Sequence, residues 1–221
     1  MYATLSRIAL AAAIAVVLSQ PVHSAAAVQI SEWMYNGDEF IELTNFGPTS
    51  VDFTGWSFDD DSRAPGTFSL SGFGVVDSGG VVIISEASAA DFRARWNLSA
   101  TVKVVGGNSA NLGRNDEINI YDGSSALVDR LTFGDQTFPG TTRTLNVSGR
   151  PNDLSALGAN NPALWVLAAV GDGAGSYTST TGGFIGNPGI APVPEPGTYA
   201  LLLAGLGLLA GVLRRTRRLS A

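Results

Sequence analysis

The chain has 221 residues, of which 45% are hydrophobic and 14% charged, and its formal net charge is −6. It contains no cysteine, and its single histidine is His23. The region after His23 therefore has no disulfide, no zinc site of the Cys/His kind, and no Ser/His/Asp or Cys/His nucleophilic site. Carboxylate chemistry remains open to it, either in glycoside hydrolysis or in calcium binding.

The N-terminus has the plan of a secretory signal peptide. Arg7 precedes an apolar run from Ile8 to Leu18, and a stretch of small residues follows from Ser24 to Ala27. A short apolar segment with a basic start and small residues at its end is removed on export. We therefore expect residues 1–27 to be a signal peptide that is cleaved between Ser24 and Ala27.

The middle of the chain is strongly acidic. All 19 acidic residues but only 8 of the 13 basic ones lie between Val28 and Gly197, so the net charge of this part is about −11. Binding to nucleic acid or acidic lipid needs a basic patch that displaces counterions. We therefore expect no nucleic-acid partner, whereas a divalent cation or a cationic partner is easier to accommodate.

Short apolar segments with a period of two residues predict a mainly β body. The nine expected strands are Val28 to Met34, Glu39 to Asn45, Val51 to Phe58, Thr67 to Leu70, Val81 to Ser85, Thr101 to Val105, Glu117 to Tyr121, Leu127 to Phe133 and Thr142 to Val147. Only one internal helix is expected, with Ser88 as its cap and with Phe92 and Trp96 on one face. This pattern predicts an all-β antiparallel sandwich.

The composition changes after the ninth expected strand. Residues 149–161 are rich in Gly and Asn and predict a loop, whereas 163–170 and 177–184 are each expected to add a strand or a turn. We place the end of the folded body at Gly189. Residues 190–197 then form a spacer rich in Pro and Gly.

Asp59, Asp60 and Asp61 form the densest run of carboxylates and are the calcium candidates. Their spacing does not follow the alternating ligands of calcium loops, so a solvated loop end is the favoured reading. Glu39 and Glu42, three residues apart on an expected strand, point to opposite faces. Glu42 could approach Asp52 across neighbouring strands, but we expect these acids to be surface groups.

The tryptophans and the arginines of the body are two further candidates for a binding site. Exposed tryptophans could stack on a polysaccharide, although core packing is the expected role for the four indoles, Trp33, Trp56, Trp96 and Trp165. Three arginines of the body are expected to form local ion pairs rather than a ligand pocket: Arg93, Arg95 and Arg114.

The C-terminus combines three elements in a fixed order. Pro194, Glu195 and Pro196 form an extended turn, residues 198–213 form an uncharged apolar run, and a basic tail of residues 214–221 follows. Clustered arginines beside an apolar helix remain on the cytoplasmic side. The sequence thus predicts a membrane helix whose stop-transfer signal is made by four residues, Arg214, Arg215, Arg217 and Arg218.

This order of elements resembles the PEP-CTERM sorting signal, which exosortases recognise in Gram-negative bacteria. Exosortases are membrane transpeptidases. The resemblance implies that the precursor is tethered to the membrane and that an exosortase cuts it near residues 194–197. It also implies an exported protein that ends in the cell envelope or outside the cell.

Segments of the body resemble the lamin-tail domain, which is an immunoglobulin-like sandwich. The matching stretches are VQISEWMYNGDEFIELTN, VDFTGWSFDDD, SGGVVIISE and DEINIYDGSSALVDRLTFGD, all between Val28 and Asp135. The closing sequence Gly186 to Gly189 also resembles the end of such domains. The resemblance implies a module that binds or displays, and it carries over no catalytic residue.

We therefore expect an exported, non-enzymatic binding or scaffold protein of the cell envelope or extracellular matrix, with no required cofactor. Exopolysaccharide or surface proteins are its expected partners. Two alternatives stay open: a protein that binds or cleaves polysaccharide through exposed tryptophans and paired acids, and a matrix protein that calcium stabilises.

Overall fold

A computed structural model describes residues 27–137, 141–192 and 205–207 of the chain. The expected signal peptide lies outside this part except for Ala27, and the expected membrane helix lies outside it except for residues 205–207. Among the helices of the described residues, none has the length and apolar character needed to cross a membrane.

The larger of the two main sheets has six strands in the order β12-β11-β1-β2-β7-β8. Five neighbouring pairs share this sheet, and all except β7–β8 are antiparallel. The strands are β1 (Val28–Met34), β2 (Phe40–Asn45), β7 (Val81–Ser85), β8 (Lys103–Gly106), β11 (Gly149–Pro151) and β12 (Trp165–Leu167).

The second sheet has four antiparallel strands in the order β10-β9-β4-β5. Its strands are β4 (Ser57–Asp59), β5 (Phe68–Ser69), β9 (Asn115–Tyr121) and β10 (Leu127–Gly134). Two short pairs add β3 (Val51–Asp52) with β6 (Val75–Val76), and β13 (Tyr177–Thr178) with β14 (Ile185–Gly186). Three single 3-10 turns complete the elements: η1 (Ser71–Phe73), η2 (Leu154–Ala156) and η3 (Pro162–Leu164).

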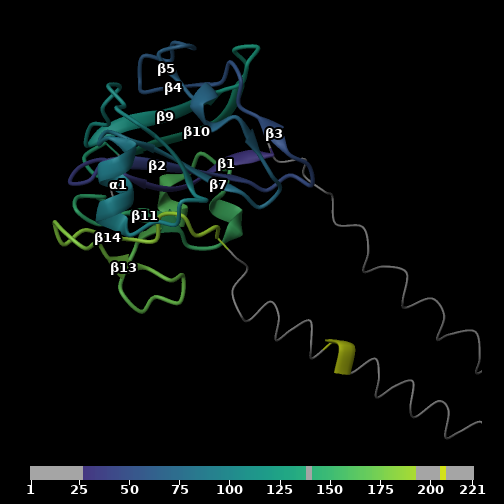
Figure 1. Cartoon of the computed structure of the whole chain (residues 1–221). Coiled ribbons are helices and arrows are strands. Elements are labelled where there is room, and N and C mark those ends of the chain that lie inside the picture. The colour runs from purple at the N-terminus through teal and green to yellow at the C-terminus, as the bar shows by residue number, and fades with distance from the viewer. Residues whose placement is uncertain (1–26, 138–140, 193–204, 208–221) are drawn as a thin grey trace, which may run out of the picture.

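The two main sheets share one hydrophobic core. β1, β2 and β7 contribute Ile30, Trp33, Leu43 and Ile84 among others, and the four-stranded sheet contributes Phe58, Ile118, Ile120, Leu131 and Phe133. The rings of Trp33 and Phe133 meet across this core, with centroids 4.0 Å apart. In Figure 1, β9 and β10 accordingly lie on one side of β1, β2 and β7.

A second core covers the opposite face of the six-stranded sheet. Met34, Phe40 and Ile83 point to this side and pack against Phe92 and Trp96 of α1 (Ala89–Trp96). Tyr177 and Phe184, from β13 and the loop before β14, complete the cluster. Figure 1 shows β13 and β14 on the side of this sheet away from β9 and β10. The central strands β1 and β2 are consequently buried along their whole length.

Helix α1 begins and ends as its sequence predicts. Ser88 accepts a hydrogen bond from the backbone N–H of Asp91 at 3.1 Å, and Asn97 ends the helix in the left-handed conformation. Because α1 returns the chain to the end of the sheet where β7 began, β8 runs parallel to β7. The expectation of a purely antiparallel body is therefore wrong at this one pair.

The strand predictions are confirmed in most places. The bounds of β1 and β7 are those expected. The expected strand Val51 to Phe58 is instead divided into β3 and β4 by a turn in which Gly55 has a φ of +79°. A Cβ at Gly55 would lie 3.2 Å from the backbone of Gly123, so only glycine allows this close approach.

The region after 141 departs furthest from expectation. Of the expected strand Thr142 to Val147, only isolated bridges at Leu145 and Val147 form. The expected loop 149–161 instead contains β11, which pairs with β1 opposite Trp33. A Cβ at Gly149 would lie 2.9 Å from the indole nitrogen of Trp33. The glycine that suggested a loop is therefore the residue that lets β11 approach the sheet.

We predict that Gly106→Ala lowers the free energy of unfolding by about 1–3 kcal/mol, as expected for overpacking a core. The added Cβ would lie 2.5 Å from the carbonyl oxygen of Ala87, where β8 passes the start of α1. Chemical denaturation measures the loss. Gly72→Ala is the control, because its Cβ would meet only a methyl of Val105, at 3.0 Å. Equal stability of Gly106→Ala and wild type would contradict this packing.

Candidate functional site

Most of the expected sorting and processing residues lie outside the described part of the chain. Ala27 is described, and its carbonyl oxygen accepts hydrogen bonds from the backbone N–H groups of Phe46 and Gly47. The residues outside are Ser24, Pro194, Glu195, Pro196, Arg214, Arg215, Arg217 and Arg218. The candidate sites that the structure places are therefore those of the body.

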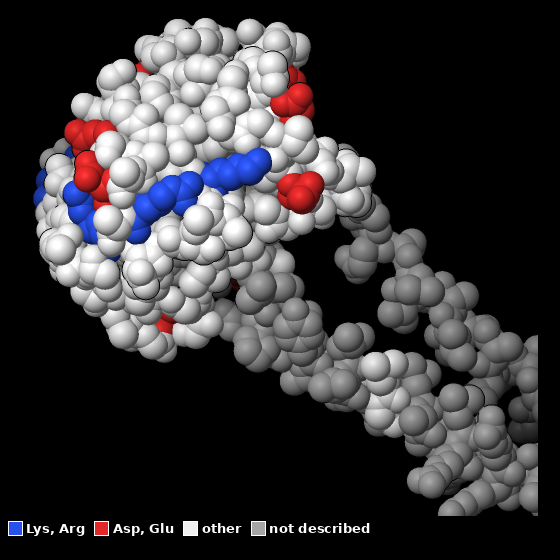
Figure 2. Space-filling view, viewed as in Figure 1, with Lys and Arg blue, Asp and Glu red and all other residues white. Residues whose placement is uncertain are grey.

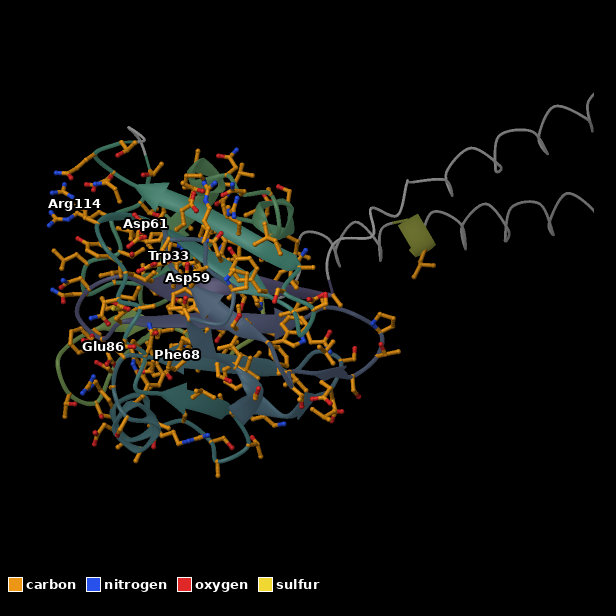
Figure 3. The ribbon with its side chains drawn as sticks, turned by 90° about the horizontal axis from the view of Figure 1, so that it is seen from above. Trp33, Asp59, Asp61, Phe68, Glu86 and Arg114 are labelled. Atoms are coloured by element: carbon orange, nitrogen blue, oxygen red, sulfur yellow. The ribbon has the colours of Figure 1, made fainter. Side chains whose placement is uncertain are left out.

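Asp59, the first of the three calcium candidates, is fully buried and organises its own loop. One carboxylate oxygen, Oδ2, accepts hydrogen bonds from the hydroxyl of Ser62 at 2.8 Å and from the backbone N–H of Ala64 at 2.7 Å. Asp60 accepts the backbone N–H of Ser62 at 3.2 Å. Figure 3 shows Asp59 within the body and Arg114 at its rim. The expectation of a solvated loop end is therefore wrong for Asp59.

Asp61 lines an open hollow at the ends of β9 and β10. Other residues of its wall include Arg63, Asp116, Glu117 and Thr132. Arg63 binds Glu117 through two hydrogen bonds of 2.7 and 2.6 Å, and this pairing lowers the pKa of Glu117 to about 2. Burial raises the pKa of Asp116, and the nearby charges of Asp61 and Asp60 raise it further. Among the described residues, no three or more His, Cys, Asp or Glu side chains are grouped to hold a metal ion.

Two glutamates lie opposite each other inside the six-stranded sheet. Glu32 of β1 pairs in register with Glu42 of β2, and each side chain is 1% exposed. Burial raises the pKa of Glu32 to about 7, and burial together with the charge of Glu32 raises the pKa of Glu42 well above its usual value. The expectation that Glu42 is a surface group is wrong, and its neighbour across the strands is Glu32 rather than Asp52.

The segment Gly186–Gly189, which we call the C-terminal latch, covers this pair. The backbone N–H of Asn187 donates to Glu32 Oε1 at 2.7 Å, and the backbone N–H of Gly189 donates to Glu42 Oε2 at 2.6 Å. The hydroxyl of Ser148 donates to the same Oε1 of Glu32, and the hydroxyl of Ser31 donates to Oε1 of Glu42. Glu32 Oε2 has no hydrogen-bond partner among the described residues. Polar groups from distant parts of the chain thus converge on two carboxylates.

Another buried acid, Glu39, lies in a separate environment. Its Oε1 accepts the backbone N–H of Leu112 at 3.0 Å, and burial raises its pKa to about 8. Asp129 of β10, which is also buried, accepts the backbone N–H of Ile30 at 2.8 Å and so links the four-stranded sheet to β1. This bond lies at the bulge of β1, where the register shifts between Ile30 and Glu32. These acids are structural acceptors for backbone groups.

The expected roles of the aromatic and basic residues are confirmed in most cases. Trp33, Trp96 and Trp165 are at most 4% exposed, and Trp56 packs against the first core. Arg95 pairs with Asp38 and Arg114 pairs with Asp135, whereas Arg93 donates to the backbone oxygen of Ser99. Figure 2 shows the basic side chains of one face as a narrow band, with acidic side chains nearby. The four indoles make no exposed stacking platform.

Comparison with protein families covers the body and the tail separately. The Lamin Tail Domain model matches residues 21–135, which is just over half of the chain. The chain belongs to the lamin tail domain family. Its matched part contains the strands from β1 to β10, so the lamin-tail match includes the four-stranded sheet and β1, β2, β7 and β8 of the larger one. The strands β11 and β12 extend that larger sheet beyond the matched residues.

The tail matches the PEP-CTERM protein-sorting motif over residues 192–218. This motif implies an exported protein that an exosortase processes and sorts to the cell surface. No curated protein matches the chain. The family assignment thus rests on the match of the lamin-tail body, and the destination rests on the sorting motif of the tail.

Sequence reasoning missed the buried glutamate pair of this lamin-tail body. Alternation along β1 fails at Ser31 because of the bulge, so the sequence hides which face Glu32 occupies. One signal was present: Glu42 lies between Ile41 and Leu43, which are both core residues. A strand that alternates in this way has apolar side chains on its core face and polar side chains on the opposite face. Whether those polar side chains are buried depends on whether another layer covers that face.

We predict that Glu39→Gln becomes more stable relative to wild type as the pH rises from 5 to 8. The folded-state pKa of about 8 lies above the ordinary 4.5, so the folded state retains a proton that the unfolded chain has lost. Wild-type stability therefore declines across this window, by on the order of 2 kcal/mol from this group. Denaturation at several pH values measures the difference between the two proteins.

Asp122→Asn is the matched control for that experiment. Asp122 is a partly exposed residue at the start of a turn, and its hydrogen bond with Ser124 lowers its pKa, so it is ionised in both states throughout the window. Its difference from wild type should stay constant. A constant difference for Glu39→Gln as well would show that Glu39 does not retain its proton in the folded protein.

Proposed function

We propose that this protein is a binding or scaffold module displayed in the cell envelope or the extracellular matrix, and that it has no enzymatic activity. The observation that carries the proposal is the junction between body and tail: Gly189, which still donates a hydrogen bond to Glu42 of the body, lies only a few residues before Pro194. An exosortase cuts near residues 194–197, removes the apolar run 198–213 with its arginines, and leaves the body intact.

The use of the acids in the body supports a non-catalytic role. Glu32 and Glu42 are covered by the latch, and Asp59 and Asp129 accept backbone N–H groups. A glycosidase needs two carboxyl groups that flank a bound sugar. The buried pair has no such access, so the polysaccharide-cleaving alternative finds no support in these acids.

The positions of the indoles also argue against the polysaccharide-stacking alternative, because three of the four indoles lie in the cores. The calcium alternative still has Asp59, Asp60 and Asp61 as its candidate ligands. Asp59 already accepts hydrogen bonds from Ser62 and Ala64 of its own loop. Loops on β-sandwiches carry many different binding functions, so the partner is defined by chemistry on the surface rather than by the fold. An acidic body of this kind favours a cationic partner.

The length of chain between the body and the sorting motif limits how far the body lies from the exosortase during processing. Four residues separate Gly189 from Pro194, which makes five steps along the chain, and an extended chain spans at most about 3.5 Å per step, or roughly 17 Å in total. The body therefore stays close to the enzyme that reads the motif. We infer that processing takes place on an already folded body.

We predict that Glu195→Ala combined with Pro196→Ala abolishes processing by an exosortase. The double change removes the acid and one of the two prolines that hold the motif extended. In a Gram-negative host that contains an exosortase, immunoblotting should show only the larger precursor, and the body should remain with the membrane fraction.

Pro192→Ala is the matched control, because it changes a neighbouring proline and leaves Pro194, Glu195 and Pro196 intact. Its processing should equal that of wild type, and wild type in a host without exosortase should resemble the double variant. Normal processing and destination of the double variant would overturn the sorting role of these residues.

A further inference from the structure

The latch is attached to the body through the buried glutamate pair and through a hydrogen bond of 3.3 Å from the side-chain amide of Asn187 to the carbonyl oxygen of Ala174. Asn187 and Gly189 each donate a backbone N–H to one carboxylate. The fit is close, because a Cβ at Gly186 would lie 2.9 Å from Glu32 Oε1 and 3.2 Å from the ring of Trp96. Just before this point the chain is held by β14, which contains Gly186 and pairs with β13, by contacts with residues 146–148, and by Phe184 in the second core.

The surroundings of the pair do not neutralise two negative charges. Neither glutamate forms a salt bridge among the described residues, and Arg150 is already paired with Asp172 at 2.8 Å. The other titratable group close to the pair is Tyr177 of β13, whose pKa rises to about 12 through burial and through the two glutamates. From β7 and α1 the pair is faced by the apolar side chains Ile83 and Trp96. Ionising both carboxyl groups while the latch covers them therefore costs free energy.

We propose that Gly186–Gly189 is a pH-dependent latch, which is docked while the Glu32–Glu42 pair retains a proton and is released when both carboxylates are charged. Release lets water reach the two carboxylates, which relieves both their desolvation and their mutual repulsion. Docking in turn favours the protonated pair, because the latch is what excludes water.

The consequence concerns the reach of the sorting tail. With the latch docked, the chain between Gly189 and Pro194 spans at most roughly 17 Å. With the latch released, the last fixed residue is Ile185. The nine steps along the chain from Ile185 to Pro194 then span up to about 31 Å. The protonation of two residues in the sheet thus sets how far from the body the processing motif can extend.

The direction of the pH dependence follows from linkage. The pKa of Glu32 is raised from 4.5 to about 7 in the docked state, and the pKa of Glu42 is also raised well above its usual value. Docking is therefore strongest below about pH 4.5 and weakens as the pH rises through 7. In this window each titrating carboxyl lowers the ratio of docked to released latch by up to about tenfold per pH unit.

A spin label next to the latch measures this equilibrium in the full-length chain. The chain has no cysteine, so Ile190→Cys provides a single attachment point for a nitroxide, and Ile190 is 41% exposed. The electron paramagnetic resonance spectrum separates immobilised from mobile label. In a mild detergent and without exosortase, the ratio of mobile to immobilised label should rise at least about threefold between pH 5 and pH 8.

Three variants on the Ile190→Cys background interpret the result. Glu32→Gln combined with Glu42→Gln should abolish the rise, whereas Glu39→Gln, which changes a buried acid away from the latch, should retain it. Gly189→Pro removes one latch N–H at a residue with a φ of +88°, so its label should be mobile at every pH.

A spectrum that stays unchanged between pH 5 and 8 would overturn the latch, and so would an equal rise in the double glutamine variant. An immobilised label in Gly189→Pro would also count against it. If circular dichroism shows that the double variant is unfolded, the wild-type profile and the Gly189→Pro spectrum decide the question by themselves.

Discussion

Burial of both faces of the six-stranded sheet is the constraint on which the rest of the structure depends. One face packs against the four-stranded sheet, and the other packs against α1, β13 and the latch. A strand with two covered faces cannot place its polar side chains in water. Glu32, Glu42 and Thr44 therefore need partners from other parts of the chain, and the serine hydroxyls and the latch provide them.

The strong negative charge of the body is in part internal. Asp129 and the glutamate pair accept backbone N–H groups from segments far away in sequence, whereas Asp59 accepts one from its own loop, so these acids hold sheets, the latch and a loop in place. Charges used in this way are stabilising only while each carboxylate has its donors or its proton. This dependence connects the fold of a lamin-tail body to pH, and the latch that donates to the glutamate pair lies directly before the sorting tail.

The body strands up to residue 134 could largely be predicted, because their patterns are local. Val28 to Met34 and Val81 to Ser85 carry their apolar residues within one strand, and Ser88 carries its own helix cap. The later strands could not be predicted, because β11 is defined by the space beside Trp33 rather than by its own composition. The parallel pairing of β8 depends likewise on where α1 packs.

The sequence by itself determined the fold class and family of the body, the sorting motif of the tail and the destination of the chain, because strand periodicity and sorting motifs are short-range patterns. Only the tertiary structure decided which acids are buried. Burial depends on the layer that folds over a strand, and for Glu32 and Glu42 that layer comes from residues about 150 positions away. The physical reason is that the pKa of a carboxyl is set by desolvation and by neighbouring charges, which no local pattern records.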